Sequence, residues 1–569
     1  MRAQYLLRLK LLTWCVILFA LVLAGRLYSI QITHGAEFES RADRQYARPA
    51  HGLYDRGSIY LRDKDGTVVS AATLRSGFTV ALDPRLLLDP NDTYEKLKAF
   101  LDIDEETFLL RAGKKDDPYE EIATEVIEEK AKAIEALEIP GVNIYRERWR
   151  FYPGGELSAQ TIGFVGFQGD TLSGRYGLER YYNDVLSRDG ENAYVNFFAE
   201  VFSSANKIIF DNAKGKGDVV TSLEPSVQLF LEKTLNDVHE QWNSRLSGGI
   251  IIDPRTGEVF ALSLSPSFDL NNFQNEEDVS LYQNQIVESI YEMGSIIKPL
   301  TMAAGIDSGK VTATTTYYDA GSITLDGYTI SNFDKKGRGR VSMQEVLNQS
   351  LNTGAAFVAT ETGTKLFRDY MLSYGLGEET GIDLPNESAG LVGNLNSPRT
   401  VEYATASFGQ GIAMTPIATV RALSVLANNG VLVTPHVGSE IRYPSGITKK
   451  ISFPDEGPVL KKETVEEITR MLVKVVDEAL LGGTVKLEHY SIAAKTGTAQ
   501  IAKKDERGYY DDRFLHSFFG YFPAYDPEFF IFLYTVEPKE VRYASQTLTH
   551  PFMDIVSFLI NYYEIGPDR

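Results

Sequence analysis

Three short motifs contain serine and lysine residues, with asparagine and threonine nearby, whose side chains could carry out acyl transfer. In chain order they are Ser295-x-x-Lys298, Ser350-x-Asn352 and Lys495-Thr496-Gly497-Thr498. A serine hydroxyl attacks a carbonyl carbon efficiently only when a neighbouring base takes its proton. A lysine in an apolar setting can lose its own proton and serve as that base. The motifs therefore contain the residue types of a serine nucleophile and a lysine base.

The first motif also fits an ordinary helix start. An apolar run follows Ser295, serine is a common N-cap, and Pro299 would fall in the first helical turn, where proline is tolerated. Lys298 would lie on the same face as Ser295, and the positive end of the helix dipole would favour negative charge on a reacting oxygen. The motif alone leaves both interpretations open.

The other two motifs have plain alternatives as well. Ser342 and Glu345 predict a capping box at the start of a helix that ends at Gln349. The Ser350 motif would then separate this helix from the next one and point two polar side chains into a cleft. A polar turn between helices is the simpler alternative. The third motif follows a strand-like run, where Gly497 would allow a ligand to approach the backbone. An edge strand with a bulge is the alternative.

The elements around these motifs predict an α+β fold. "GGIIIDPRTGEVFALSLSPSFDL" (248–270) is typical of two strands joined by a turn, and three further strand-like runs lie near the C-terminus, in 489–500, 516–524 and 528–538. Helical patterns lie between the two groups, including 462–483, which Gly482 and Gly483 should end. A sheet built from both ends of a domain, with helices inserted, is an α+β arrangement.

The N-terminal half has a different pattern. Asp65 and Gly66 predict the turn of a hairpin, and the charged stretch 92–137 predicts helices with one exposed face. Strand-like alternation returns from Gly141. The Gly/Lys-rich stretch 212–218 is the best candidate for a domain boundary.

The first residues predict a membrane anchor. Arg2, Arg8 and Lys10 precede an apolar run that starts at Leu11 and, after one arginine, extends to Ile32. A span needs about 20 residues, and the positive flank would keep the N-terminus in the cytoplasm. A cleaved signal peptide is the alternative, and either one exports the body of the protein.

Composition argues against several classes of protein. The formal net charge of −20 disfavours binding to nucleic acid, and the single cysteine, Cys15, permits no intrachain disulfide. The seven histidines and the glycines match no metal-site or P-loop spacing, so we expect no cofactor and no metal.

Together, the three motifs in this order match the signature of serine penicillin-recognising enzymes. Over nearly its whole length the chain resembles class B penicillin-binding proteins, which are membrane-anchored peptidoglycan D,D-transpeptidases; "RGSIY" (56–60), "FGQGIAMTP" (408–416) and "SFFGYFPA" (517–524) are similar to their motifs. The resemblance implies an antiparallel sheet flanked by helices, with an all-helical lobe, above an extended α+β pedestal. It implies a cytoplasmic tail, a transmembrane anchor, a dimerisation-like pedestal and a transpeptidase domain at 1–10, 11–32, 33–216 and 217–569.

The resemblance also implies a role for each motif residue. Ser295 would attack the penultimate D-Ala carbonyl of a stem peptide, and Lys298 would take its proton. Ser350 would relay a proton to the leaving amine, and Asn352 would orient the substrate amide and Lys298. The substrate-binding set would be Lys495, Thr496, Gly497 and Thr498. Its lysine and first threonine would hold the substrate carboxylate, with the second threonine assisting. The backbone N–H groups of Ser295 and Thr498 would form an oxyanion hole, and β-lactams would acylate the same serine.

The resemblance extends to the biological setting. The family usually has proline where Met293 stands and serine where Leu351 stands, and neither position has a named chemical role. Ser-x-Asn resembles the septal, cell-division type, which implies other division proteins as partners and a catalytic domain outside the plasma membrane. Because no glycosyltransferase pattern precedes the catalytic domain, the resemblance also implies a separate glycan-polymerising partner. We expect neither a glycosyltransferase segment before the catalytic domain nor an appended module after it.

Other functions remain open at this point. They are an elongation-type transpeptidase, a D,D-carboxypeptidase that uses water as acceptor, a β-lactamase or β-lactam sensor, and a catalytically idle division scaffold. The segment 501–516 is predicted to be a solvated hairpin, with a mobile flap over the cleft as the alternative.

Overall fold

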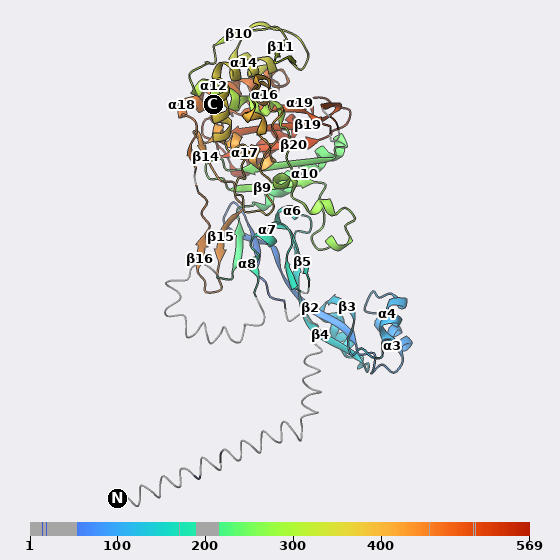
Figure 1. The fold of residues 1–569 in the computed structure, drawn as a ribbon. Helices are drawn as coiled ribbons and strands as arrows, with labels where there is room; N and C mark the ends of the chain where they lie inside the picture. Colours follow the sequence, from blue (N-terminus) through green and yellow to red (C-terminus); the bar gives the residue numbers. More distant parts are fainter. Residues whose placement is uncertain are drawn as a thin grey trace, which may run out of the picture. The chain divides into compact units, whose positions relative to one another are not determined.

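The computed structural model describes residues 54–169, 171–188, 215–454, 456–503, 506 and 508–569, together with Trp14 and Phe19. The chain forms two compact units (Figure 1). The predicted tail and anchor lie outside the described residues apart from Trp14 and Phe19. Across the described ranges, no helix has both the length and the apolar character that crossing a membrane requires.

The smaller unit contains Leu74–Trp149 and consists of strands and short helices. The second half of β2 (Val68–Leu82) pairs antiparallel with β3 (Glu120–Val126), and β4 (Val142–Phe151) also pairs with β2. Its helices are α3 (Pro90–Leu97), α4 (Glu105–Ala112) and α5 (Glu128–Glu135). Apolar side chains from the strands and from all three helices form one buried cluster.

The prediction that 92–137 is helical throughout was wrong for β3. Ile122, Thr124 and Val126 stand at alternate positions, and β-branched side chains at a period of two favour a strand. Pairing with β2 satisfies backbone groups along one side of this segment. The surrounding acidic residues hid the alternation in the sequence.

The larger unit begins with the predicted hairpin. β1 (Ile59–Arg62) pairs antiparallel with the first part of β2, and Gly66 adopts a φ of 81° in the turn between them. On its other side β1 pairs parallel with β7 (Asp218–Thr221), which pairs with β15 (Gly438–Arg442), and β15 pairs with β16 (Thr448–Lys450). The remaining elements of this part are α6 (Ala159–Ile162), β5 (Val165–Gln168), β6 (Thr171–Gly174), α7 (Gly177–Tyr181) and α8 (Asn183–Leu186).

A five-stranded antiparallel sheet forms the centre of the larger unit. Its order is β18-β19-β20-β8-β9, so strands from both ends of the predicted domain lie side by side. Their bounds are Leu246–Ile252 (β8), Val259–Ser265 (β9), Ala493–Ala502 (β18), Tyr509–Phe522 (β19) and Phe529–Val536 (β20). The α+β prediction is confirmed, and β18, which carries the third motif, is an edge strand.

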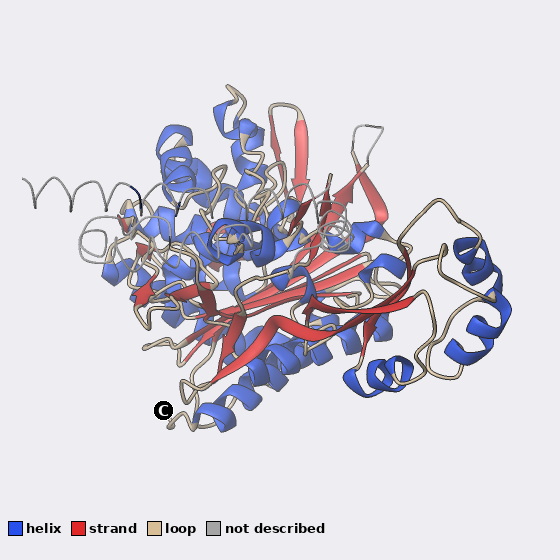
Figure 2. Ribbon diagram, turned by 90° about the horizontal axis from the view of Figure 1, so that it is seen from below, coloured by secondary structure: helices blue, strands red, loops and turns tan. Residues whose placement is uncertain are grey.

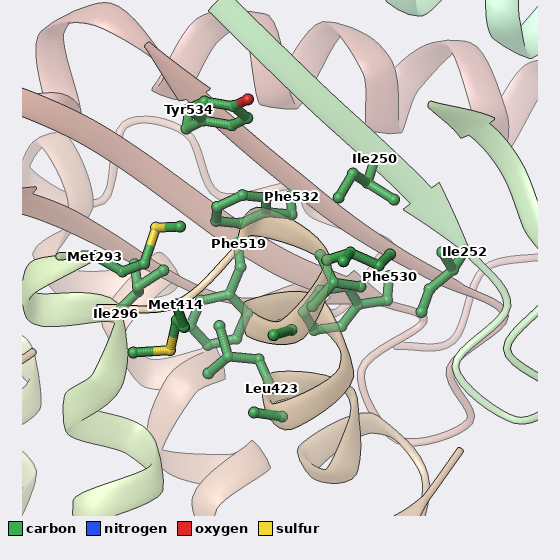
Figure 3. Close-up of a cluster of buried hydrophobic side chains, with 14 of the residues drawn as sticks. Ile250, Ile252, Met293, Ile296, Met414, Leu423, Phe519, Phe530, Phe532 and Tyr534 are labelled. Carbon is green, nitrogen blue, oxygen red and sulfur yellow. The ribbon is translucent and has the colours of Figure 1, made fainter. Parts of the chain in front are cut away.

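Helices cover both faces of this sheet (Figure 2). Ile251 and Phe518 point to a face where they pack in one cluster with α10 (Pro225–Trp242) and α20 (Thr549–Tyr563). Their neighbours Ile250 and Phe519 point to the opposite face, where Figure 3 shows Met293 beside the aromatic side chains of the sheet. The turn that carries Ser295 is therefore fixed to the sheet by apolar packing.

The lobe on this second face contains eight of the described α-helices. They are α11 (Gln285–Glu288), α12 (Lys298–Asp307), α13 (Met343–Asn348), α14 (Asn352–Thr362), α15 (Thr364–Ser373), α16 (Thr400–Ala406), α17 (Pro416–Ser424) and α18 (Lys462–Lys474). The predicted helix over 462–483 continues past α18 as one π-helical turn (Val475–Ala479) and one 3₁₀ turn (Leu480–Gly483).

The prediction that this lobe is all-helical was wrong. Two short ribbons interrupt it, β10 (Thr316–Asp319) with β13 (Gly339–Ser342) and β11 (Ser322–Leu325) with β12 (Tyr328–Ser331). Asp326 and Gly327 join β11 to β12, with φ of 50° and 81°. An Asp-Gly pair with both φ positive is the two-residue turn that hairpins favour.

Candidate active site

Ser295 lies at a helix start, as predicted. One 3₁₀ turn, η5 (Gly294–Ile297), leads directly into α12, and Ser295 is half-buried in that turn. Gly294 has a φ of 68°, and a Cβ there would come within 3.0 Å of the Thr498 carbonyl oxygen. A glycine is therefore needed for the chain to turn this tightly against β18.

Lys298 is buried below Ser295 and joins the first two motifs. Its side chain is 1% exposed, and Nζ lies 2.6 Å from the Ser350 carbonyl oxygen, 3.1 Å from Ser350 Oγ and 2.8 Å from Asn352 Oδ1. Burial lowers the pKa of Lys298 well below its ordinary value, and the nearby charge of Lys495 lowers it further. The Lys298 ammonium therefore loses its proton far more readily here than in water.

The second motif occupies the junction between α13 and α14. Ser342 accepts the Glu345 N–H at the start of α13, but the Glu345 carboxylate bonds to the side chains of Asn348 and Gln349, so only half of the predicted capping box is present. Ser350 adopts a φ of 53°, a left-handed conformation that interrupts the helical path. Its carbonyl and hydroxyl oxygens both face Lys298.

Lys495 approaches the same serine from β18. Its Nζ donates to Ser350 Oγ at 3.1 Å and to the Thr496 carbonyl at 2.8 Å. The side chain is 3% exposed, and burial lowers the pKa of Lys495 to about 7. The Ser350 hydroxyl therefore lies within hydrogen-bond distance of two lysine amines.

Gly497 allows a close contact between β18 and the Ser295 turn that the sequence did not indicate. We expected this glycine to admit a ligand, whereas a Cβ here would lie 2.9 Å from the Met293 carbonyl oxygen and 3.0 Å from Ile296 Cγ2. The missing side chain lets β18 pass close to the Ser295 turn. One residue later, Thr498 Oγ1 accepts the Ala544 N–H at 3.1 Å.

The motifs converge on a cleft of about 1740 Å³. The predicted site residues that line it are Ser295, Ser350, Asn352, Lys495, Thr496 and Thr498. Lys298 and Gly497 are not among the lining residues. Among the described residues, no group of His, Cys, Asp and Glu side chains is arranged to hold a metal ion.

Glu292 is a residue of this site that the sequence reasoning missed. Its Oε1 accepts the Gly411 N–H at 3.0 Å and the Tyr509 hydroxyl at 3.1 Å, and burial raises its pKa while these bonds lower it. Tyr509 begins β19, so Glu292 ties the predicted hairpin to the Ser295 turn. The only signal in the sequence was an acidic residue three positions before the serine.

Comparisons with known proteins agree with this geometry. A family model described as the penicillin binding protein transpeptidase domain matches residues 248–557, and one described as the penicillin-binding protein dimerisation domain matches residues 54–200. Stage V sporulation protein D of Bacillus subtilis is 31% identical over 96% of this chain and 84% of its own length.

Two further proteins extend the likeness. Peptidoglycan D,D-transpeptidase FtsI of Buchnera aphidicola is 25% identical, over 98% of this chain and 96% of its own length. The crystal structure of penicillin binding protein 2X from Streptococcus thermophilus has a TM-score of 0.72 and 20% identity, covering 90% of this chain and 81% of that one. The chain therefore belongs to the class B penicillin-binding proteins, and it is a serine-type peptidoglycan D,D-transpeptidase of cell-wall synthesis.

Proposed function

We propose that Ser295 is the nucleophile and Lys298 the base of this transpeptidase. Ser295 Oγ attacks the carbonyl carbon of the penultimate D-Ala, and its proton passes to Lys298. The bond to the terminal D-Ala nitrogen breaks, that nitrogen takes a proton relayed through Ser350, and an ester on Ser295 remains. An amine of a second stem peptide then attacks the ester, forms the cross-linking amide and releases the serine.

The observation that carries this proposal is the set of bonds around Lys298. The Ser350 carbonyl oxygen and Asn352 Oδ1 have no proton to give, so they take two N–H groups of the amine. In the neutral form this leaves the lone pair for a hydroxyl proton. Burial favours that neutral form by lowering the Lys298 pKa. These features support Lys298 as the base, and the hydroxyl that lies within hydrogen-bond distance of its Nζ is that of Ser350, at 3.1 Å.

The position of β18 beside the Ser295 turn supports a role of this strand in substrate binding. Lys495 and Thr496 would hold the carboxylate of the donor peptide, with Thr498 assisting, and Gly497 would keep this strand close to the nucleophile. The backbone N–H groups of Ser295 and Thr498 would stabilise the oxyanion. A β-lactam would enter the same cleft and leave a stable ester on Ser295.

The wider organisation is part of the proposal. We assign 1–10 to a cytoplasmic tail, 11–32 to a single transmembrane anchor, 33–216 to a pedestal and 217–569 to the transpeptidase domain, outside the plasma membrane. The charged flank before the apolar run supports the anchor. A separate partner would polymerise the glycan strands, since the matching family models describe dimerisation and transpeptidase domains.

The reaction is tested with the purified full-length chain, nascent glycan strands and a separate polymerase. We expect cross-linked peptide dimers with the wild type and none with Ser295→Ala. Released D-Ala without dimers would contradict the transpeptidase assignment and favour a carboxypeptidase.

The septal role is tested in cells. The Ser-x-Asn form of the second motif supports a role in septal synthesis, with other division proteins as partners. Depletion should then give long cells that fail to divide, and a fluorescent fusion should gather at division sites. Loss of cell shape with normal septa would instead indicate the elongation type.

A further inference from the structure

A buried carboxylate lies behind the second motif. Asp319, at the end of β10, is 1% exposed and accepts hydrogen bonds from the N–H groups of Gly321 (2.9 Å) and Arg338 (3.0 Å) and the Thr353 hydroxyl (2.8 Å). The side-chain amide of Asn332 donates to both of its oxygens, at 3.0 and 2.9 Å. Each of these donors is uncharged. The Arg338 guanidinium is a nearby positive charge, since Asp319 helps to raise the pKa of Arg338. Burying a carboxylate that accepts only from neutral donors is still costly, which suggests that the contacts held by Asp319 have a function.

The contacts of Asp319 join three separate elements. Asn332 and Arg338 belong to the segment 331–338, which lines the cleft with several side chains, and Thr353 is in the first turn of α14. The Thr353 N–H donates to Asn332 Oδ1 at 3.2 Å. The ribbon that contains β10, the cleft segment and the start of α14 are thus held by one carboxylate.

The same interface fixes the orientation of Asn352. Its side-chain amide donates to the Ser331 carbonyl at 2.9 Å, while its Oδ1 lies 2.8 Å from Lys298 Nζ. Two successive residues of α14 therefore bond to two successive residues of the cleft segment. An amide side chain has a donor end and an acceptor end, and the Ser331 carbonyl decides which end faces the lysine.

We propose that Asp319 is a positioning residue of this active site. It holds the segment 331–338 so that the Ser331 carbonyl turns the Asn352 amide with its oxygen toward Lys298. The inference rests on the proposed role of Lys298 as the base. It predicts that Asp319 acts on acylation through Asn352 and not through stability alone.

The first test is Asp319→Asn, which places an amide where two oxygens now accept four N–H donations and one O–H donation. Acylation of the full-length chain by a fluorescent penicillin is followed against pH. We expect a fall of about tenfold or more, because small shifts of catalytic groups have large effects on rate. The acid limb of the profile should also move to lower pH, since Lys298 loses an acceptor that favours its ammonium form.

This pH shift has few other possible sources. The charged group that faces Lys298 is Lys495 on β18, and the partners from the α13–α14 junction, Ser350 and Asn352, are neutral. Asp319→Asn leaves β18 untouched. Asp319→Asn also removes a buried negative charge, so a moved acid limb reports the lost Asn352 contact when Thr353→Val, which keeps that charge, moves the limb in the same direction.

A double-mutant cycle separates positioning from stability. In an Asn352→Ala background, Asp319→Asn should change the acylation rate by less than about twofold, because the group through which it acts is gone. Thr353→Val removes the hydroxyl that contacts Asp319, Asn332 and Tyr317 but keeps the carboxylate. It should reproduce the loss more weakly, and it replaces Asp319→Asn as the test if that variant folds poorly.

Asp383→Asn is the matched control. Asp383 is also fully buried and accepts from uncharged donors, the Tyr182 hydroxyl at 2.6 Å and the N–H groups of Val437 (2.7 Å) and Gly438 (2.6 Å). It does not line the cleft, so its variant should melt earlier yet keep the acylation pH profile. A wild-type pH profile of acylation in Asp319→Asn would overturn the inference. So would a double variant whose acylation rate falls by the product of the two single reductions. Failure of the wild type to label at Ser295 would instead contradict the proposed function.

Discussion

Replacing Gly497 by alanine should push β18 away from the turn that carries Ser295. The added Cβ would overlap Ser517 Oγ, and it would lie 2.9 Å from the Met293 carbonyl oxygen and 3.0 Å from Ile296 Cγ2. Ser517 cannot easily move aside, because its hydroxyl donates to that same Met293 carbonyl at 2.9 Å. The strand or the turn must therefore shift.

Two magnitudes follow from these contacts. Overpacking a buried site by one methyl group costs about 1–3 kcal/mol of unfolding free energy. The functional loss should be larger than the stability loss suggests, because the proposed oxyanion donors of Ser295 and Thr498 lie on the two elements that are forced apart. Misplacing such donors by a fraction of an ångström lowers the acylation rate by roughly 10- to 100-fold.

The assay compares Gly497→Ala with Gly393→Ala in thermal melting and in acylation by a fluorescent penicillin. A Cβ at Gly393 meets no atom within 4 Å, so that variant should behave as wild type. Gly497→Ala should melt earlier and acylate more slowly. Wild-type melting and acylation in Gly497→Ala would refute the packing of β18 against the Ser295 turn.

Two further predictions concern charge. Since burial lowers the pKa of Lys495 to about 7, binding of a carboxylate-bearing donor should weaken as the pH rises through that value and the ammonium is lost; a KM that stays constant from about pH 6 to about pH 9 would contradict this. Glu179→Gln should lower the unfolding free energy by about 3–5 kcal/mol in urea titrations, because it leaves the buried Arg56, now 2.6 Å from Glu179, without its anion. Asp92→Asn, in an exposed pair, should have almost no effect, and equal losses would refute the reasoning.

The central sheet and the helix start at Ser295 could be predicted because their signals are local. Apolar runs of strand length marked β8, β9 and the C-terminal strands, and a glycine before a serine and an apolar run marked the start of α12. The strand β3 was missed because acidic residues masked its alternation. The ribbon β11–β12 was missed although its Asp-Gly turn was visible in the sequence.

The motif residues could be identified from their spacing and family resemblance, but the residues that support them could not. Glu292 meets Tyr509, and Asp319 meets Thr353, only after the chain has folded, and no periodic pattern connects such distant positions. The structural role of Gly497 could not be predicted either, because its close neighbour Met293 is distant in the sequence. Long-range contacts of this kind require the tertiary structure.

The central claim is that Ser295 forms the acyl-enzyme. Its most direct test is to label the purified full-length chain with a fluorescent penicillin and to map the modified peptide by mass spectrometry, with Ser295→Ala as the control. We predict one stable adduct, on the peptide that contains Ser295, and none in a variant that melts like the wild type. An adduct on another residue, equal labelling of Ser295→Ala, or no adduct on the folded wild type would contradict the account.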